Sequence, residues 1–209
     1  MPLDLEEQEQ VAELRSWWNQ WGTLISAVLL AAALGFAGFQ GWSWYQRSQS
    51  VEAATLYENL ARAVQANDAK AVREAGGTLV ESYPRTLYAS MGALLSARYY
   101  FDKADLKGAK AQLQWVIDRS GSDDLRDLAR LRLGAILLDE KAYDEALKLA
   151  EAPHAAAYDA RYAALKGDVQ SARKQPAEAK ASYQAALEKS KDDPAFRESV
   201  RLRLEALGG

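Results

Sequence analysis

Residues 22–39, GTLISAVLLAAALGFAGF, form an apolar stretch without a charged residue, and the rest of the chain is organised around it. A helix needs about 20 apolar residues to cross the hydrocarbon core of a bilayer, and its backbone groups then pair with one another instead of with lipid. Tryptophan and tyrosine flank the stretch on both sides, as in the aromatic belts of membrane interfaces. These aromatic residues are Trp17, Trp18, Trp21, Trp42, Trp44 and Tyr45. The pattern predicts a single membrane-spanning helix over residues 22–45.

Residues 1–21 differ from the leader of a cleaved signal peptide. They contain five acidic residues and one arginine, whereas a signal peptide begins with a basic segment and has an apolar core of about 7–15 residues. We therefore predict an acidic tail with a short amphipathic lead-in, followed by a retained anchor; disorder over residues 1–10 is the alternative. Arg15 lies before the apolar stretch and Arg47 after it, so the distribution of positive charge does not decide the orientation.

Small residues recur at helical spacing within the apolar stretch. Because small side chains let two membrane helices approach closely, these positions are candidate contacts for a partner helix. The alternative is that alanine and glycine are common in any spanning helix. The candidate contacts are Ala27, Ala31, Gly35, Ala33, Ala37, Gly38 and Gly41.

Composition argues against most catalytic chemistry. The formal net charge is −3, no region is basic enough for nucleic-acid binding, and the absence of cysteine excludes disulfides, thiol catalysis and cysteine-ligated zinc. The single histidine, His154, has no nearby cluster of ligands and is predicted to be a solvated loop residue. We predict no catalytic residue, no cofactor and no metal, and therefore a protein that is not an enzyme.

Beyond residue 46 the sequence predicts a succession of amphipathic helices joined by short connections. Alanine is abundant, proline is sparse, and no stretch alternates with period 2 long enough to form a strand. The fold class is therefore all-α. The predicted helices cover residues 48–66, 68–82, 86–102, 105–119, 123–140, 142–152, 155–173, 176–190 and 194–207.

An internal repeat is present in this succession of helices. Ala71, Ala109, Ala146 and Ala179 recur at spacings close to the 34 residues of helix–turn–helix repeats. Twelve residues before the later three anchors lies another small residue, which would let the two helices of a unit pack closely. These small residues are Ala97, Gly134 and Gly167.

These units resemble tetratricopeptide repeats, although no tryptophan opens a unit and Ala150 replaces a usual bulky residue. The resemblance implies a helical-repeat solenoid over residues 46–209. Repeats must stack to bury their apolar faces, and residues 194–207 have the amphipathic pattern of a capping helix.

In such a solenoid the first helix of each unit lines an inner face, which we predict to be a groove for an apolar segment of another polypeptide. The face lacks the lysine and asparagine positions with which some tetratricopeptide clamps hold a C-terminal carboxylate. The alternative is that the C-terminal helix of the chain fills the groove. A charged side chain in place of Leu131 is expected to separate the two, because loss of the partner with retained helicity supports the groove and unfolding supports internal packing. The predicted groove residues are Met91, Leu94, Arg98, Phe101, Leu128, Leu131, Ala135, Leu138, Arg161, Ala164 and Asp168.

The whole layout resembles the YfgM family of ancillary SecYEG translocon subunits. The most similar stretches are FDKADLKGAKAQLQWVID (101–118), LRDLARLRLGAILLDEKAYDEAL (125–147) and ARYAALKGDVQSARKQPAEAKASYQAAL (160–187). The resemblance implies a bacterial inner-membrane protein with its N-terminus in the cytoplasm and its repeats in the periplasm. It also implies association with SecYEG and a PpiD-like membrane-anchored chaperone, assisting newly exported client polypeptides. A structural scaffold of a cell-envelope complex unrelated to export is the alternative function.

Overall fold

The computed structural model describes residues 5–190 and 193–208, with side chains from residue 12 onward, and the prediction of an all-α chain is confirmed. Contacts divide the chain into two units, one up to Gln49 and one from Ser50. Within the described ranges every element is helical. The elements are α1 (Leu5–Gln65), α2 (Ala69–Ser82), α3 (Leu87–Asp102), α4 (Leu106–Arg119), α5 (Asp123–Asp139), α6 (Tyr143–Ala150), the 3₁₀ turn η1 (Ala156–Tyr158), α7 (Asp159–Ala172), α8 (Pro176–Lys189) and α9 (Pro194–Ala206).

The helix predicted to begin at residue 48 is the last part of α1, which has no break between Leu5 and Gln65. Residues 42–50 contain neither proline nor glycine, the two residues least favourable in the interior of a helix. The first four residues of the predicted acidic tail, including Asp4, lie outside the described residues.

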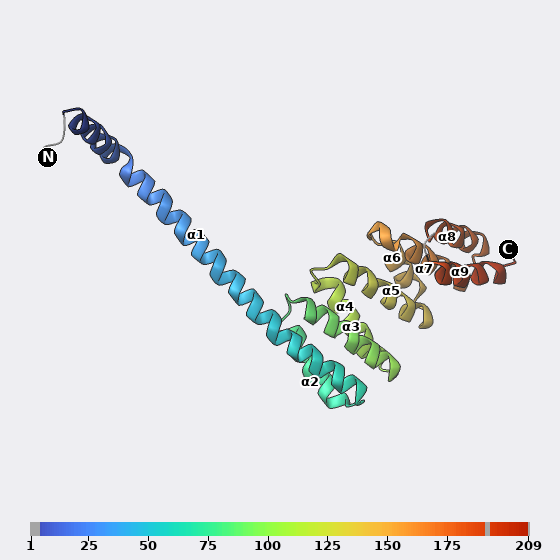
Figure 1. Cartoon of the computed structure of the whole chain (residues 1–209). Helices are drawn as coiled ribbons and strands as arrows, with labels where there is room; N and C mark the ends of the chain where they lie inside the picture. The colour runs from blue at the N-terminus through green and yellow to red at the C-terminus, as the bar shows by residue number, and fades with distance from the viewer. Residues whose placement is uncertain (1–4, 191–192, 209) are drawn as a thin grey trace. The chain divides into compact units, whose positions relative to one another are not determined.

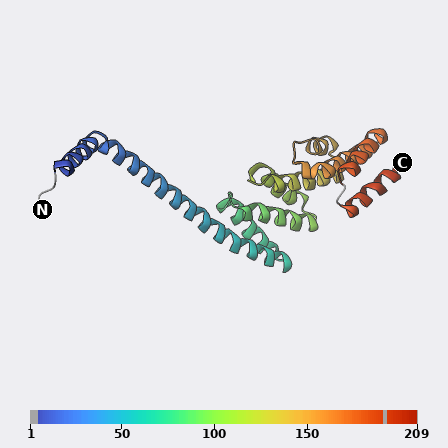
Figure 2. The ribbon, with the colours of Figure 1, turned by 45° about the horizontal axis from the view of Figure 1, so that its top comes forward.

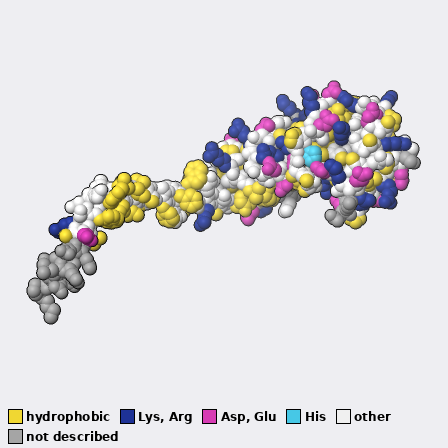
Figure 3. Space-filling view, turned by 90° about the horizontal axis from the view of Figure 1, so that it is seen from above, with side chains coloured by type: hydrophobic (Ala, Val, Ile, Leu, Met, Phe, Trp, Pro, Cys, Tyr) yellow, Lys and Arg dark blue, Asp and Glu magenta, His cyan; other side chains and the backbone are white. Residues whose placement is uncertain are grey.

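The apolar stretch within α1 is long and apolar enough to cross a membrane. Its large side chains are exposed: Leu24, Leu30 and Phe39 have relative exposures of 58%, 62% and 68%. Figure 3 shows hydrophobic side chains covering this part of α1, whereas charged side chains are spread over the repeat units. An apolar surface of this kind is stable in lipid, as the anchor prediction requires.

From Ser50 onward the helices form pairs that stack in series, as Figure 1 shows for α2 to α9. The last turns of α1 pair with α2, α3 pairs with α4, α5 with α6, and α7 with α8. From α2 onward each helix packs on the next, and α5 also contacts α3 and α7 of the neighbouring pairs. The end of α1 shares a cluster of buried residues with α2 and α3. This is the helical-repeat solenoid predicted from the sequence.

The same turn joins the two helices of every pair. Its central residue has a positive φ in all four cases: 57° at Asn67, 59° at Ala104, 62° at Lys141 and 60° at Lys174. The next residue donates its backbone N–H to a carbonyl five residues earlier, for example Ala142 N to Leu137 O at 2.8 Å. This is the hydrogen bond of a helix end closed by a left-handed residue. The repeat register predicted from the alanine spacing is therefore visible in the backbone.

The anchoring alanines of the last three units, Ala109, Ala146 and Ala179, are fully buried. The small residues of the first helices have two different neighbours. A Cβ on Gly167 would lie 2.6 Å from the ring of Tyr183 within the same pair, but one on Gly134 would lie 2.6 Å from Leu165 Cδ2 in the next pair. Gly134 therefore permits close stacking between units, whereas the sequence predicted that it lets the two helices of its own unit pack closely.

Three clusters of buried residues hold the solenoid together. The largest extends from α3 to α7 and includes Leu113, Val116 and Leu133. A second joins the end of α1 to α2 and α3 around Leu60 and Leu79. The third joins α7, α8 and α9, where Val200 of α9 is fully buried. The predicted capping role of α9 agrees with this position, and Figure 2 shows α9 lying alongside the preceding pair.

Candidate functional site

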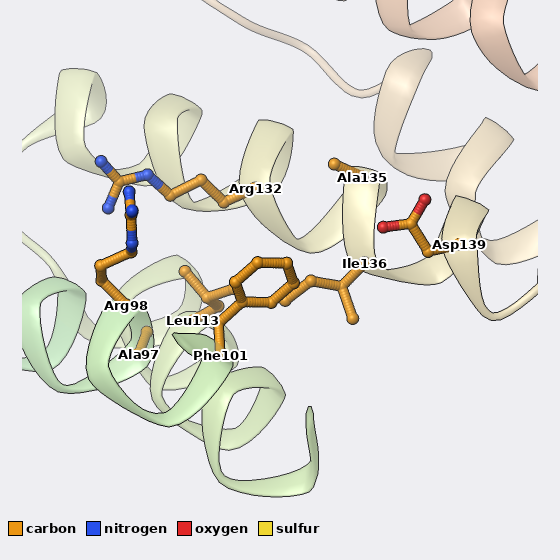
Figure 4. A pocket seen from close by; sticks show the side chains of 8 residues that line it. All are labelled: Ala97, Arg98, Phe101, Leu113, Arg132, Ala135, Ile136 and Asp139. Atoms are coloured by element: carbon orange, nitrogen blue, oxygen red, sulfur yellow. The ribbon is translucent and has the colours of Figure 1, made fainter. Parts of the chain in front are cut away.

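A pocket of about 310 Å³ opens between α3 and α5, with α4 behind it (Figure 4). Buried Leu113 and Ile136 contribute to its apolar lining, whereas Phe101 is 44% exposed and lies across the middle of the pocket. An exposed phenylalanine beside an apolar hollow is characteristic of a binding surface. The lining residues are Ala97, Arg98, Phe101, Leu113, Arg132, Ala135, Ile136 and Asp139.

Charged groups lie at opposite ends of this pocket. Figure 4 shows the guanidinium groups of Arg98 and Arg132 next to each other at one end and the carboxylate of Asp139 at the other. Arg98 donates through Nε to both carboxylate oxygens of Asp102, at 2.8 and 2.9 Å. Desolvation, and then the charge of Arg98, lower the pKa of the Arg132 guanidinium. The pocket therefore has a positive end that already contains two repelling cations.

Three of the predicted groove residues line this pocket: Arg98 and Phe101 from α3, and Ala135 from α5. Met91 lies half-buried in the same helix, nearer its start. Leu94 is only 6% exposed and belongs to the large core cluster, so it supports the wall of the groove from behind.

The predicted residues of α5 other than Ala135 serve mainly as packing. Leu128, Leu131 and Leu138 are half-buried and pack against the large core cluster. A charge at Leu131 would therefore disturb folding as well as binding, and it does not separate the two alternatives for the groove. Phe101 is better suited to that test, because its side chain is exposed at the pocket.

The predicted groove residues of α7 contact α9 or the residue that caps its start, although Arg161 itself stays exposed at the edge. Arg161 contacts Asp193 at 3.2 Å and lies over the ring of Phe196, and Ala164 packs in the cluster that contains Val200. Arg203 of α9 donates to Asp168 at 2.8 Å. The two alternatives thus apply to different parts of the face: α9 covers the α7 part, whereas the residues lining the α3–α5 pocket include none from α9.

Asp168 is held by two neighbours within this covered part. Tyr183 Oη donates to it at 2.8 Å, beside the ion pair with Arg203. Burial raises the pKa of the Asp168 carboxyl although the positive charge of Arg203 opposes the shift. The geometry is that of a structural contact between α7, α8 and α9.

A buried polar cluster around Asp127 fixes the connection between α6 and α7. The Asp127 carboxylate is 1% exposed and accepts hydrogen bonds from Tyr162 Oη at 3.0 Å, from the Ala155 backbone N–H at 3.0 Å and from Arg130 at 2.9 Å. Arg130 also donates to the carbonyl of Pro153 at 3.2 Å. These side chains pair with the backbone of residues 153–155, which explains why the predicted helix start at residue 155 gives way to an irregular connection and η1.

The prediction of a solvated His154 is wrong. Its ring stacks on Tyr162, with the ring centroids 3.8 Å apart, and its Nε2 lies 3.2 Å from Asp159. His154 is part of the packing around the Asp127 cluster. Among the described residues no group of three or more histidine, cysteine or acidic side chains could hold a metal ion.

A second hollow lies on another face of the repeats, between α4, α5 and α6, and contains none of the predicted groove residues. Its floor includes Leu133 and Leu137, and its rim includes Lys110 and Lys148. Lys110 forms an ion pair with Glu140 at 2.6 Å.

The candidate contacts of the membrane helix, from Ala27 to Gly41, are all exposed. Apart from the adjacent backbone of the helix itself, no described atom would lie within 4 Å of a Cβ built on Gly35, Gly38 or Gly41, so these positions have room for a second helix. Their role as helix–helix contacts remains a prediction.

Comparison with known proteins identifies relatives for nearly the whole chain. The profile of a family described as a tetratricopeptide repeat-like domain matches residues 15–209. The chain is 32% identical over 208 residues to an ancillary SecYEG translocon subunit of Neisseria gonorrhoeae, covering 99% of this chain and 100% of that protein. It is 28% identical to the subunit so named in Haemophilus influenzae, over 89% of this chain and 91% of that protein. The corresponding protein of Escherichia coli is 23% identical, with 99% of each chain covered.

Proposed function

The chain belongs to the tetratricopeptide repeat-like family of ancillary SecYEG translocon subunits, and on that premise we propose that it is a membrane-anchored protein-interaction subunit of the Sec translocon. The relatives carry that name over nearly their full length. Tetratricopeptide-like repeats are a protein-interaction fold rather than an enzyme fold, which agrees with a role in binding.

In this proposal the apolar part of α1 crosses the bacterial inner membrane once, with the N-terminus in the cytoplasm and the repeats in the periplasm. The exposed apolar side chains of α1 and their flanking tryptophans support the membrane position. A reporter enzyme that is active only in the periplasm, fused to the C-terminus, tests the orientation. Periplasmic activity is expected, and cytoplasmic location of the reporter would contradict it.

The observation that carries the binding role is the exposed Phe101 beside the apolar pocket between α3 and α5. Because the anchor confines the repeats to the membrane surface, the effective concentration of a membrane-bound partner near this pocket reaches the millimolar range for a short linker. We propose that the pocket binds a segment of SecYEG or of a PpiD-like chaperone, and that this binding assists newly exported polypeptides.

Site-specific crosslinking in native membranes tests this role. A photoreactive amino acid at Phe101 is expected to crosslink to a translocon subunit or to the membrane-anchored chaperone. The matched control is the same amino acid at Glu178, an exposed position on α8. Crosslinks from position 101 that reach only other cell-envelope complexes would contradict the proposal and support a structural scaffold unrelated to export.

A further inference from the structure

Only one of the three charged residues that line the α3–α5 pocket has an ion-pair partner among the described residues. Arg98 forms an ion pair with Asp102. Among the described residues, Arg132 has no carboxylate partner and Asp139 has no cationic partner. Arg132 also lies beside a second guanidinium, which repels it. An anion at this end of the pocket would relieve that repulsion and pair with Arg132 at the same time.

The apolar part of the pocket lies between its charged ends. Figure 4 shows Phe101, Leu113 and Ile136 between the two arginines and Asp139. A complementary ligand therefore carries apolar groups next to a carboxylate. The other end of the ligand, which would lie near the Asp139 carboxylate, is suited to carry a cationic group.

The lining also indicates the conformation of the ligand. All eight lining residues lie within α3, α4 or α5, and none of them is a serine, threonine, asparagine or glutamine. Their backbone N–H groups are already used within helices. An extended peptide would therefore find no partner here for its own backbone, whereas a helix satisfies its backbone internally and presents apolar anchors to a groove.

We propose that this pocket binds one face of an amphipathic helix of another polypeptide, and that Arg132 pairs with an aspartate or glutamate side chain on that face. The inference rests on the proposed function, because it takes the pocket as the partner site and specifies the partner. Phe101 and Ile136 contact the apolar side chains of the bound helix. Arg98 remains paired with Asp102.

Peptide binding to the purified full chain in detergent tests the chemistry of the partner without the translocon. The probes are fluorescein-labelled 14-residue helical peptides with leucines at positions i, i+3, i+4 and i+7. One peptide carries a glutamate beside the leucines, and a second carries glutamine in its place; both have blocked ends. The third is the glutamine peptide with a free C-terminal carboxylate. We expect the glutamate peptide to bind about tenfold more tightly than the glutamine peptide at low salt, as a charge-assisted hydrogen bond predicts.

Two variants and one control assign the effect to the pocket. Arg132→Gln is expected to weaken the glutamate peptide about tenfold and to leave the glutamine peptide unchanged. Phe101→Ala is expected to weaken both. Lys148→Gln removes a positive charge from the second hollow and is expected to change neither. Because Arg132 and Phe101 are exposed, these changes leave the core intact, and circular dichroism of each variant checks this.

Equal binding of the glutamate and glutamine peptides to the unmodified chain would overturn the inference. It would also be overturned if the peptide with a free C-terminal carboxylate bound most tightly, since the pocket would then recognise a chain end. Peptide discrimination together with missing crosslinks to the translocon would retain the pocket chemistry and reject the proposed function. Crosslinks to the translocon without peptide discrimination would retain the proposed function and reject the pocket chemistry.

Discussion

Removing the buried carboxylate of Asp127 is predicted to free the connection between α6 and α7. Three donors point at this carboxylate, and one of them is the Ala155 backbone N–H. A hydrogen bond from a neutral donor to a charged acceptor contributes roughly 1.5–3 kcal/mol, and such contributions are not fully additive. We therefore expect Asp127→Ala to destabilise the connection by about 3–4 kcal/mol. Asp127→Asn keeps the shape and one carbonyl oxygen, so about half of that loss is expected.

Hydrogen exchange of the full chain in detergent, followed by mass spectrometry of peptides covering residues 151–162, measures this effect locally. Since every 1.4 kcal/mol is a factor of ten in an equilibrium constant, Asp127→Ala should speed exchange there by roughly 150- to 700-fold. Asp124→Ala, an exposed position on the same helix, is the control and should cost less than about 1 kcal/mol. If exchange over residues 151–162 changed less than threefold in Asp127→Ala, the carboxylate would not hold this connection. Should the alanine variant unfold altogether, the asparagine variant would still report the local loss.

Three further predictions concern stability, each measured by thermal or chemical unfolding of the full chain. Lys141→Gly should stabilise the repeats by roughly 0.5–1 kcal/mol because its positive φ strains a side chain, whereas Asn67→Gly should gain little since asparagine tolerates this conformation. Asp105→Ala should cost about 1 kcal/mol because it removes the acceptor for the Gly108 N–H at the start of α4; no loss would show that water replaces the cap. Burial, and then the hydrogen bond to Asp127, raise the pKa of Tyr162 to about 12, so its contribution to stability is complete below pH 10 and is lost as the pH rises to 12. Tyr162→Phe should therefore reduce the loss of stability over this interval by about 2–3 kcal/mol, and an unchanged pH profile would contradict the assignment.

The sequence predicted the repeats because their signals are local. Small residues at fixed spacing, capping residues and helical periodicity all act within one or two turns, and the buried alanines Ala109, Ala146 and Ala179 occupy equivalent places in the structure. The continuous α1 was missed because the change from apolar to amphipathic composition near residue 46 resembles a boundary. A change in the environment of a helix does not by itself end it, and residues 42–50 contain no proline or glycine that would interrupt the backbone.

The groove was only partly predictable, because the face of α5 that lines it depends on how neighbouring pairs rotate against each other. The tetratricopeptide pattern indicated Leu128, Leu131, Ala135 and Leu138, whereas the pocket uses Arg132, Ala135, Ile136 and Asp139. The second set has the spacing i, i+3, i+4 and i+7, so its members lie on one face of α5, next to the predicted face and sharing Ala135 with it. Its polar ends made it resemble a solvated face. The cluster of Asp127 and Tyr162 was not predictable, because 35 residues separate the two and no local pattern joins them.

The position of α9 has a consequence for crowding at the membrane. A solenoid whose last pair was uncovered would expose Tyr183 and Ala186, and the matching apolar surface of another molecule could continue the array. In this chain α9 covers that surface with Val200 and turns Glu198, Arg201 and Glu205 outward. Because α9 occupies this surface, end-to-end stacking of copies through α8 is disfavoured in a shared bilayer.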